Sequence, residues 1–153
     1  MILNIIIDTS GSMADMVKSK IGRITLDSLV SYTRHFRQDT QLRVFLWNDT
    51  FRKVDVDVEI QPGGKALFTP LAEYFCSIKN AKSQNNAEGW LLLSDGCWDL
   101  TELEGFIKDT AESLPKISGL AIGADADFFK LEKIAGKGNV FLSEDVFEAF
   151  ESC

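Results

Sequence analysis

Histidine, cysteine and proline are scarce in this sequence, and the first two shortages exclude whole classes of chemistry. The 153 residues include one histidine, three cysteines and three prolines. A Ser-His-Asp hydrolase needs a histidine beside its nucleophile, but His35 stands among basic residues near the end of an expected helix, where the helix dipole favours positive charge. The cysteines are odd in number and lack the CxxC spacing of zinc or redox sites, as expected for a reduced cytoplasmic protein. They are Cys76, Cys97 and Cys153.

Basic residues and long hydrophobic runs are also in short supply. Lysine and arginine number 16 against 23 acidic residues, giving a net charge of −7. Nonspecific nucleic-acid binding relies on basic side chains that neutralise phosphates, so we expect no nucleic-acid partner. No apolar run approaches the length needed to span a bilayer, and no basic leader precedes the first apolar segment. We therefore expect a cytoplasmic protein with no membrane partner.

What remains is the composition of an ordinary globular protein, with 45% hydrophobic and 25% charged residues. The length and the absence of a linker or repeat predict one domain over residues 1–153. Apolar strands alternate with amphipathic helices along the chain. The expected strands are 2–7, 41–47, 51–60, 89–94, 117–122 and 140–141. The expected helices are 14–37, 69–81, one starting at 101, 127–135 and 143–152, with a polar connection over 79–88.

This alternation predicts an α/β fold: a doubly wound, mostly parallel central sheet with helices on both faces. Strand 2–7 is apolar on both sides, which places it centrally. Segment 51–60 alternates valine and isoleucine with charged residues, as in a half-exposed antiparallel strand at the sheet edge. Helix starts are expected at Thr69 before Pro70, at Thr101 with Glu104 in a capping box, and at Ser143.

Polar side chains follow two of these buried strands directly. Asp8-x-Ser10-x-Ser12 follows strand 2–7, and Asp95 with Gly96 follows strand 89–94. Carboxylates and hydroxyls are hard oxygen ligands that suit Mg²⁺. The carboxyl ends of parallel strands meet at the edge where open α/β sheets bind ligands. These segments therefore mark a candidate site.

Together these motifs resemble the metal-ion-dependent adhesion site of von Willebrand factor type A (VWA) domains, whose fold is Rossmann-like. Ser94-Asp95-Gly96 is similar to a second loop of that site, and Pro62-Gly63-Gly64-Lys65 resembles its Gly-Gly-Thr loop, in the family's order. The resemblance implies that Ser10 and Ser12 bind the metal directly, while Asp8 and Asp95 bind through water. It further implies a non-enzymatic, small, bacterial-type intracellular module, with an acidic group of a partner protein completing the metal shell.

One position departs from the family pattern, because Lys65 stands where the family has a metal-binding threonine. Three interpretations are open. The Lys65 ammonium takes the place of the cation between Asp8 and Asp95; or it points to solvent and a weak metal site persists; or the alignment shifts and Thr69 reaches the site. An ammonium close to a metal would repel it. We therefore expect Mg²⁺ binding to be weak or absent because of Lys65.

The loops at this edge also carry large apolar residues that would suit a protein interface. We predict that Lys65, Phe68 and Trp98 contact the partner; the alternative for the aromatic residues is that they fold down into the core. Asp125 and Asp127 follow strand 117–122 near the same edge, and Asp127 is expected to cap the next helix.

Two other functions compete with the interaction module. Asp8 and Asp95 could hold Mg²⁺ for phosphoryl transfer, although a haloacid-dehalogenase-type site would need Asp-x-Asp where this chain has Asp8-Thr9-Ser10. A redox-controlled dimer through Cys97 or Cys153 is the third possibility. The leading hypothesis is a cleft that binds a partner protein through an acidic side chain or a loop.

Overall fold

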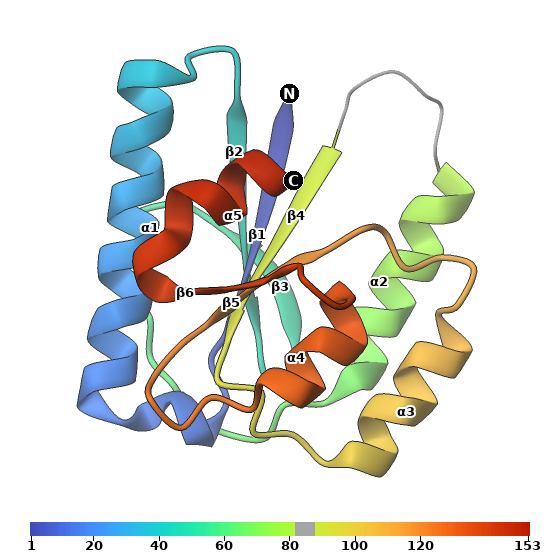
Figure 1. Cartoon of the computed structure of the whole chain (residues 1–153). Coiled ribbons are helices and arrows are strands. Elements are labelled where there is room, and N and C mark those ends of the chain that lie inside the picture. Colours follow the sequence, from blue (N-terminus) through green and yellow to red (C-terminus); the bar gives the residue numbers. More distant parts are fainter. Residues whose placement is uncertain (82–87) are drawn as a thin grey trace.

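A six-stranded sheet runs through the middle of the molecule, in the order β3-β2-β1-β4-β5-β6 (Figure 1). The computed structural model describes residues 1–81 and 88–153. All neighbouring strands are parallel except β2 and β3, which are antiparallel at the edge. This confirms the predicted sheet. The strands are β1 (Ile2–Asp8), β2 (Gln41–Trp47), β3 (Phe51–Val54), β4 (Glu88–Ser94), β5 (Ser118–Ala121) and β6 (Val140–Leu142).

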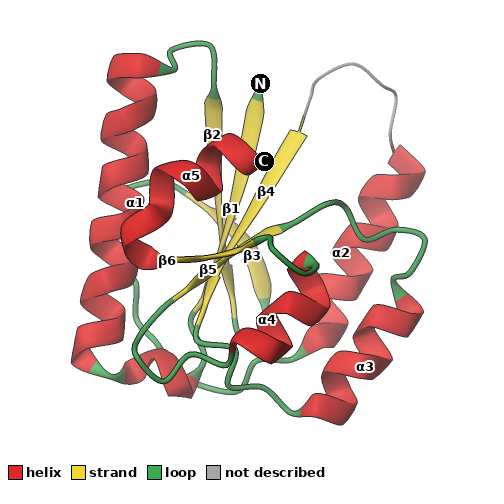
Figure 2. Cartoon of the chain, in the orientation of Figure 1, coloured by secondary structure: helices red, strands yellow, loops and turns green. Residues whose placement is uncertain are grey.

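Helices cover both faces of the sheet (Figure 2). They are α1 (Met16–Phe36), α2 (Phe68–Ala81), α3 (Leu100–Asp109), α4 (Phe128–Ala135) and α5 (Val146–Ser152), with short 3₁₀ turns at Gly11–Ala14 and Ser143–Asp145. One face packs against α1 and α5, and the other against α2, α3 and α4. None of the helices in the described ranges combines the length and the apolarity that a membrane span requires.

The central strand shows how the sequence divides between the two faces. Leu3, Ile5 and Ile7 point into the α1–α5 side, whereas Ile6 points into the α2–α4 side. Every residue of β1 is buried, because a parallel strand between two others is covered on both faces. Asn4 is the polar residue within the apolar run of β1, before Asp8 at its end, and its amide donates a hydrogen bond to the Gly89 carbonyl at 3.3 Å.

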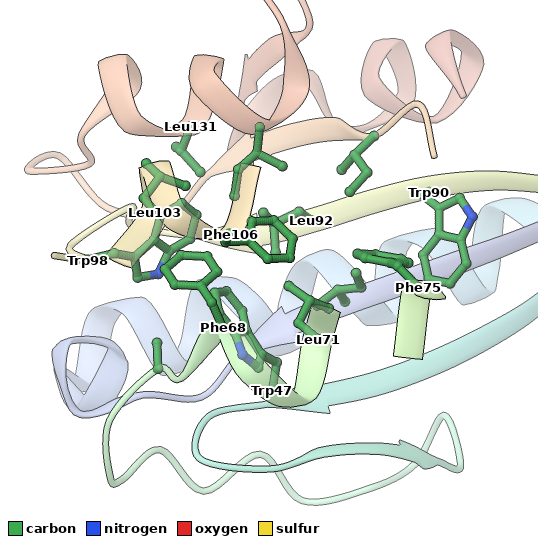
Figure 3. Close-up of a cluster of buried hydrophobic side chains, with 14 of the residues drawn as sticks. Trp47, Phe68, Leu71, Phe75, Trp90, Leu92, Trp98, Leu103, Phe106 and Leu131 are labelled. Atoms are coloured by element: carbon green, nitrogen blue, oxygen red, sulfur yellow. The ribbon is translucent and has the colours of Figure 1, made fainter. Parts of the chain in front are cut away.

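The core on the α2–α4 side is rich in aromatic residues (Figure 3). Phe75 of α2 meets Trp90 of β4 edge to face, with ring centroids 5.1 Å apart. Trp47, at the end of β2, packs beside Phe68 and Trp98. The cluster therefore continues up to the carboxyl edge of the sheet.

Loops at the carboxyl edge, which is the lower edge in Figure 1, are tied to one another by backbone hydrogen bonds. The Gly11 amide donates to the Gly64 carbonyl at 2.9 Å, and the Gly63 amide donates to the Thr9 carbonyl at 2.7 Å. A Cβ atom on Gly11 would lie only 3.2 Å from the Gly64 oxygen, so glycine allows the close approach. The loop after β1 and the loop before α2 thus form one rigid edge.

The two chain ends lie at the opposite, amino edge (Figure 1). A Cβ atom built on Gly89 would meet Cβ of Cys153 at 2.6 Å and the side chain of Met1 at 3.2 Å. Both termini therefore pack beside the start of β4.

Several predicted boundaries were wrong. Helix α2 begins at Phe68, so Thr69 and Pro70 lie within its first turn and Thr69 is not its N-cap. The edge strand β3 ends at Val54, not at 60; beyond it Val58 and Ile60 still pack on the core without a strand partner, and Arg23 donates to the Val58 carbonyl at 3.1 Å. The alternating pattern over 51–60 therefore indicates which side chains are buried, but not where the strand ends. The expected Ser143 cap makes no side-chain capping bond, and a 3₁₀ turn comes first. The predicted polar connection 79–88 lies mostly outside the described residues.

Helix α3 begins one residue before the predicted Thr101. Its N-cap is Asp99, whose carboxylate accepts a hydrogen bond from the Glu102 amide at 2.9 Å. A carboxylate is a stronger acceptor than a hydroxyl at this position and also meets the positive end of the helix dipole.

Replacing Asp99 with alanine should lower the free energy of unfolding by about 1 kcal/mol, the usual cost of a lost N-cap. Thr101→Ala is the matched control and should change stability by less than about 0.5 kcal/mol, as an exposed substitution. Urea unfolding followed by tryptophan fluorescence measures both. If Thr101→Ala lowered the free energy of unfolding more than Asp99→Ala did, Thr101 would be the N-cap, as the sequence predicted.

Candidate functional site

Asp8, the last residue of β1, is completely buried at the carboxyl edge. Three donors from its own chain surround its carboxylate. The Ser10 amide donates to Oδ1 at 2.9 Å, while the Ser94 hydroxyl and the Trp98 indole donate to Oδ2 at 2.6 and 2.9 Å. Asp8 thus ties the ends of β1 and β4 and the following loop together.

Burial raises the pKa of Asp8 above its ordinary value of 3.8, and the hydrogen bonds from Ser94, Ser10 and Trp98 oppose only part of that rise. Burial acts this way because removing water disfavours the charged form. The folded chain therefore holds a proton on Asp8 more tightly than the unfolded chain does.

Asp95, which follows β4, is the second fully buried carboxylate of the site. Its Oδ1 atom accepts from the Ser12 hydroxyl at 3.1 Å and from the Cys97 amide at 3.0 Å. The hydroxyls of Ser10 and Ser12 are 3.2 Å apart. The structure therefore brings together all four residues predicted as the metal site: Asp8, Ser10, Ser12 and Asp95.

A cation from within the chain also reaches this site. Lys18, in the first turn of α1, places Nζ 2.8 Å from Oδ2 of Asp95 and 2.8 Å from Oδ2 of Asp125, which lies in the loop after β5. The Ser12 carbonyl lies 3.4 Å from the same ammonium. The lysine side chain is 10% exposed, whereas that of Asp125 is 66% exposed. Asp125 therefore lies at the solvent side of a partly buried ion triad.

Lys18 and Asp125 each stabilise the charged form of the other. Burial by itself would lower the pKa of Lys18, but hydrogen bonds and attraction to Asp125 and Asp95 outweigh it and raise that pKa. The hydrogen bond from Lys18 in turn lowers the pKa of Asp125. Gly123 leaves room for the lysine, because a Cβ atom there would lie 2.9 Å from its Cε, and its φ of +93° also favours glycine.

Lys18 was not among the site residues predicted from the sequence, although one signal marks it. The buried face of α1 comprises Lys18, Gly22, Thr25, Leu26, Leu29 and Thr33. Lys18 falls on this face at helical spacing, and a lysine there needs a buried counter-charge. A charged residue on the apolar face of α1 is therefore the signal in the sequence that indicates Lys18.

Lys65 does not occupy the cation's place, which corrects the first interpretation of this residue. Its ammonium lies 2.6 Å from Oε1 of Glu102 on α3, and its side chain is 63% exposed. Thr69 does not line the pocket beside the serines, which has a volume of about 200 Å³. The ammonium that approaches the acidic site belongs to Lys18.

These residues do not fit a tightly held divalent cation. The oxygens of Ser10, Ser12 and Asp95 are of the right kind, but Lys18 already compensates the Asp95 carboxylate, and Asp8 accepts three hydrogen bonds from its own chain. A further positive ion beside the ammonium would be repelled.

Two predicted partner contacts, Phe68 and Trp98, lie in the core. Their exposed fractions are 7% and 5%, and the two rings pack edge to face with centroids 5.5 Å apart. Trp98 turns inward because its indole satisfies the buried Asp8 carboxylate. Both residues therefore belong mainly to the core and shape the carboxyl edge from below; of the predicted set, only Lys65 is exposed.

Other apolar residues are exposed at this edge. More than half of the exposed large hydrophobic side chains in the described ranges lie in the first turn of α1, α3 or α4 or directly before α2. They are Met16, Val17, Leu67, Leu100, Phe128 and Phe129. Helices α1, α3 and α4 follow parallel strands that end at the carboxyl edge, and the Leu67 amide bonds to the Asn48 carbonyl just after β2. These six side chains, here called the apolar rim, therefore lie at the same edge as the buried carboxylates.

Comparison with known proteins supports the fold. No family model matches the chain, and no curated protein matches it in sequence. A crystal structure of an aerotolerance-related membrane protein from Bacteroides fragilis, carrying multiple mutations to serine, superposes with a TM-score of 0.64 and 10% identity over 100% of both chains.

Two further solved structures are similar. Proximal thread matrix protein 1 from the mussel byssus gives a TM-score of 0.68 at 16% identity; the match covers 99% of this chain but 44% of the mussel protein. Manganese-loaded TRAP protein from Plasmodium vivax gives 0.66 at 15% identity, covering 96% of this chain and 70% of that one. The fold shared with these structures is the VWA fold.

The ion triad generates the first prediction for the site. Lys18→Met keeps the side-chain length but leaves the Asp95 carboxylate buried without a counter-ion, which should lower the free energy of unfolding by about 3–5 kcal/mol. The double variant Lys18→Met/Asp95→Asn should recover more than half of that loss, because it leaves no buried charge uncompensated. Urea unfolding at pH 7 compares them. Equal losses in the two variants would show that packing, and not charge, explains the effect.

Asp8 gives a prediction of pH dependence. A raised pKa in the folded state means that Asp8 contributes stability below its unfolded pKa, near 4, and that this contribution disappears as the pH rises through the folded value. Asp8→Asn has no such proton, so its stability relative to the wild type should increase between pH 4 and pH 7. Urea unfolding across this range measures the difference, with Asp55→Asn, at an exposed carboxyl, as the control. A difference that decreases with pH would contradict the raised pKa.

Proposed function

We propose that this chain is a non-enzymatic protein-interaction module that binds a partner protein at the carboxyl edge of its sheet. The observation that carries the proposal is the apolar rim, formed by helix starts around the buried carboxylates. Exposed aromatic and aliphatic side chains around a charged, well-ordered centre are typical of the most strongly contributing parts of protein interfaces. The VWA fold is consistent with such a module.

In this proposal the acidic site organises the edge from within. Asp8 and Asp95 accept hydrogen bonds from the loop after β1, the end of β4 and the loop that follows β4, and Lys18 supplies a positive charge beside Asp95. The resembled family uses a metal ion here, and the TRAP neighbour is manganese-loaded. For this chain we propose that Mg²⁺ or Mn²⁺ binds weakly or not at all, so partner binding does not depend on a bridging ion.

Burial of the carboxylates supports a binding role over the phosphoryl-transfer alternative. A nucleophile or general base must reach a substrate atom at hydrogen-bond distance. Asp8 and Asp95 are both 0% exposed, and each carboxylate is held by donors of its own chain. The proposal therefore assigns these residues a positioning role. Turnover of a generic phosphoester that Asp8→Asn abolishes would overturn it.

Phe129 tests the proposed interface directly. Its ring is 61% exposed in the first turn of α4, with Lys133 5.0 Å above the ring centroid. Phe129→Ser should reduce capture of partner proteins from a lysate of expressing cells by about tenfold, as expected when an aromatic residue central to an interface is lost.

Phe36→Ser is the matched control, because Phe36 is 74% exposed at the far end of α1. Quantitative mass spectrometry of the captured proteins compares the two variants. If both variants capture partners equally well, or lose them equally, the carboxyl edge is not the interface.

Metal binding has its own test. A Mn²⁺ titration should raise the melting temperature of Lys18→Met, in which Asp95 and Asp125 lose their shared cation, but not that of the wild type. Lys65→Thr restores the family's residue, yet it should gain no metal affinity, because Lys65 is paired with Glu102. Calorimetry confirms any binding. Saturable Mn²⁺ binding by the wild type in the micromolar range would contradict the proposal that the internal lysine replaces the metal.

A further inference from the structure

Helices α2 and α3 lie side by side on the outer surface of the molecule (Figure 1). Between them runs a groove of about 490 Å³, here called the α2–α3 groove. Its lining is mainly apolar, with Phe68 and Phe106 contributing aromatic rings from the core. Its volume is in the range of ligand-binding clefts. The groove is separate from the buried carboxylates, which do not line it.

The rim of the groove is acidic. Glu73 of α2 and Asp109 of α3 are exposed on its two sides, and neither has an ion-pair partner among the described residues. Glu102 lies at one end, where it bonds Lys65. Unpaired carboxylates on both sides of an apolar channel favour an occupant that carries positive charge.

A second hollow, of about 400 Å³, continues the groove toward the C-terminal end of α3. It shares Cys76 and Asp109 with the first hollow. Its lining is mixed in charge: Lys79 and Glu112 form an ion pair at 3.1 Å, and Lys108 also lies there, so the acidic character is confined to the first hollow. The channel therefore extends along both helices. That shape suits an elongated occupant better than a compact one.

Gly105 deepens the groove at a cost to the helix that forms it. Glycine within a helix is about 1 kcal/mol less favourable than alanine. A Cβ atom built on Gly105 would meet nothing within 4 Å, and its φ is not positive, so neither packing nor backbone geometry requires glycine here. The open space beside Gly105 belongs to the groove, so a large side chain at this position would fill the channel.

We propose that the α2–α3 groove binds an amphipathic helix of a partner protein, with leucine-like side chains on the apolar floor and lysine or arginine against Glu73 and Asp109. Helices bind between helices in this way by burying one apolar face. An uncharged small molecule would cover the acidic rim without compensating it, which costs desolvation free energy. The proposal does not depend on the function assigned to the carboxyl edge.

The probe is a short fluorescein-labelled peptide of leucine and lysine, with the leucines on one helical face. Its counterpart replaces every lysine with glutamate. Fluorescence anisotropy with the full chain should show saturable binding of the lysine peptide and none of the glutamate peptide. Equal binding of both peptides would overturn the charge-based choice of occupant.

Two changes to the groove should each weaken binding of the lysine peptide by about tenfold, equivalent to about 1.4 kcal/mol. Gly105→Trp fills the channel, and Glu73→Gln/Asp109→Asn removes the acidic rim without adding bulk. Gly105→Ala is the small-residue control: it should raise the melting temperature and leave affinity within about twofold, because a methyl group leaves the channel open.

A lysine peptide also attracts acidic surfaces nonspecifically, so a matched charge control is needed. Asp57→Asn/Glu59→Gln, in the exposed segment after β3, changes the net charge by the same amount away from the groove. It should leave affinity within about twofold at physiological salt. An equal loss in this control, or unchanged affinity in Gly105→Trp with normal circular dichroism, would overturn the proposal.

Discussion

The buried carboxylate of Asp8 is the constraint on which the carboxyl edge depends. An ionised group at this depth is costly unless donors surround it. The chain meets that requirement with an amide, a hydroxyl and an indole from three places: the loop after β1, the end of β4 and the loop that follows it. Trp98 is therefore an inward-facing residue, and its ring extends the aromatic core to the sheet edge.

The Asp95 carboxylate is compensated differently, by an ion pair with a lysine in the first turn of α1. This contact joins the helix on one face of the sheet to a loop that leads to the other face. Because Asp125 shares the ammonium, the loops after β4 and β5 are fixed relative to α1 as well. In a site built in this way the fold itself places a positive charge between two carboxylates.

The sequence predicted the sheet well because its signals are local. The apolar runs at Ile2–Asp8 and Glu88–Ser94, and the polar residues that follow them, identify the strands and the edge at which the candidate site lies. The order of the motifs also pointed to the VWA fold. Segment 51–60 shows the limit: alternation of side chains reports which residues are buried, but hydrogen bonding to β2 stops at Val54.

The side chains of the site were harder to predict, for a physical reason. Whether Trp98 points outward depends on whether a distant carboxylate needs its indole, and that requires knowing that Asp8 is buried beside it. The position of Lys65 likewise depended on Glu102, thirty-seven residues away. Lys18 could have been recognised from its place on the apolar face of α1, but its partner Asp125 lies 107 residues further along the chain.

The arrangement of the chain ends has a practical consequence for engineering. Both termini pack beside Gly89 at the amino edge, while the acidic site and the apolar rim occupy the opposite edge. Adjacent termini allow a domain to be inserted into a host loop or circularly permuted with little strain. Reporter domains joined at either end would lie at the amino edge, away from the acidic site and the apolar rim, so the chain could be mounted on a surface with the carboxyl edge facing solution.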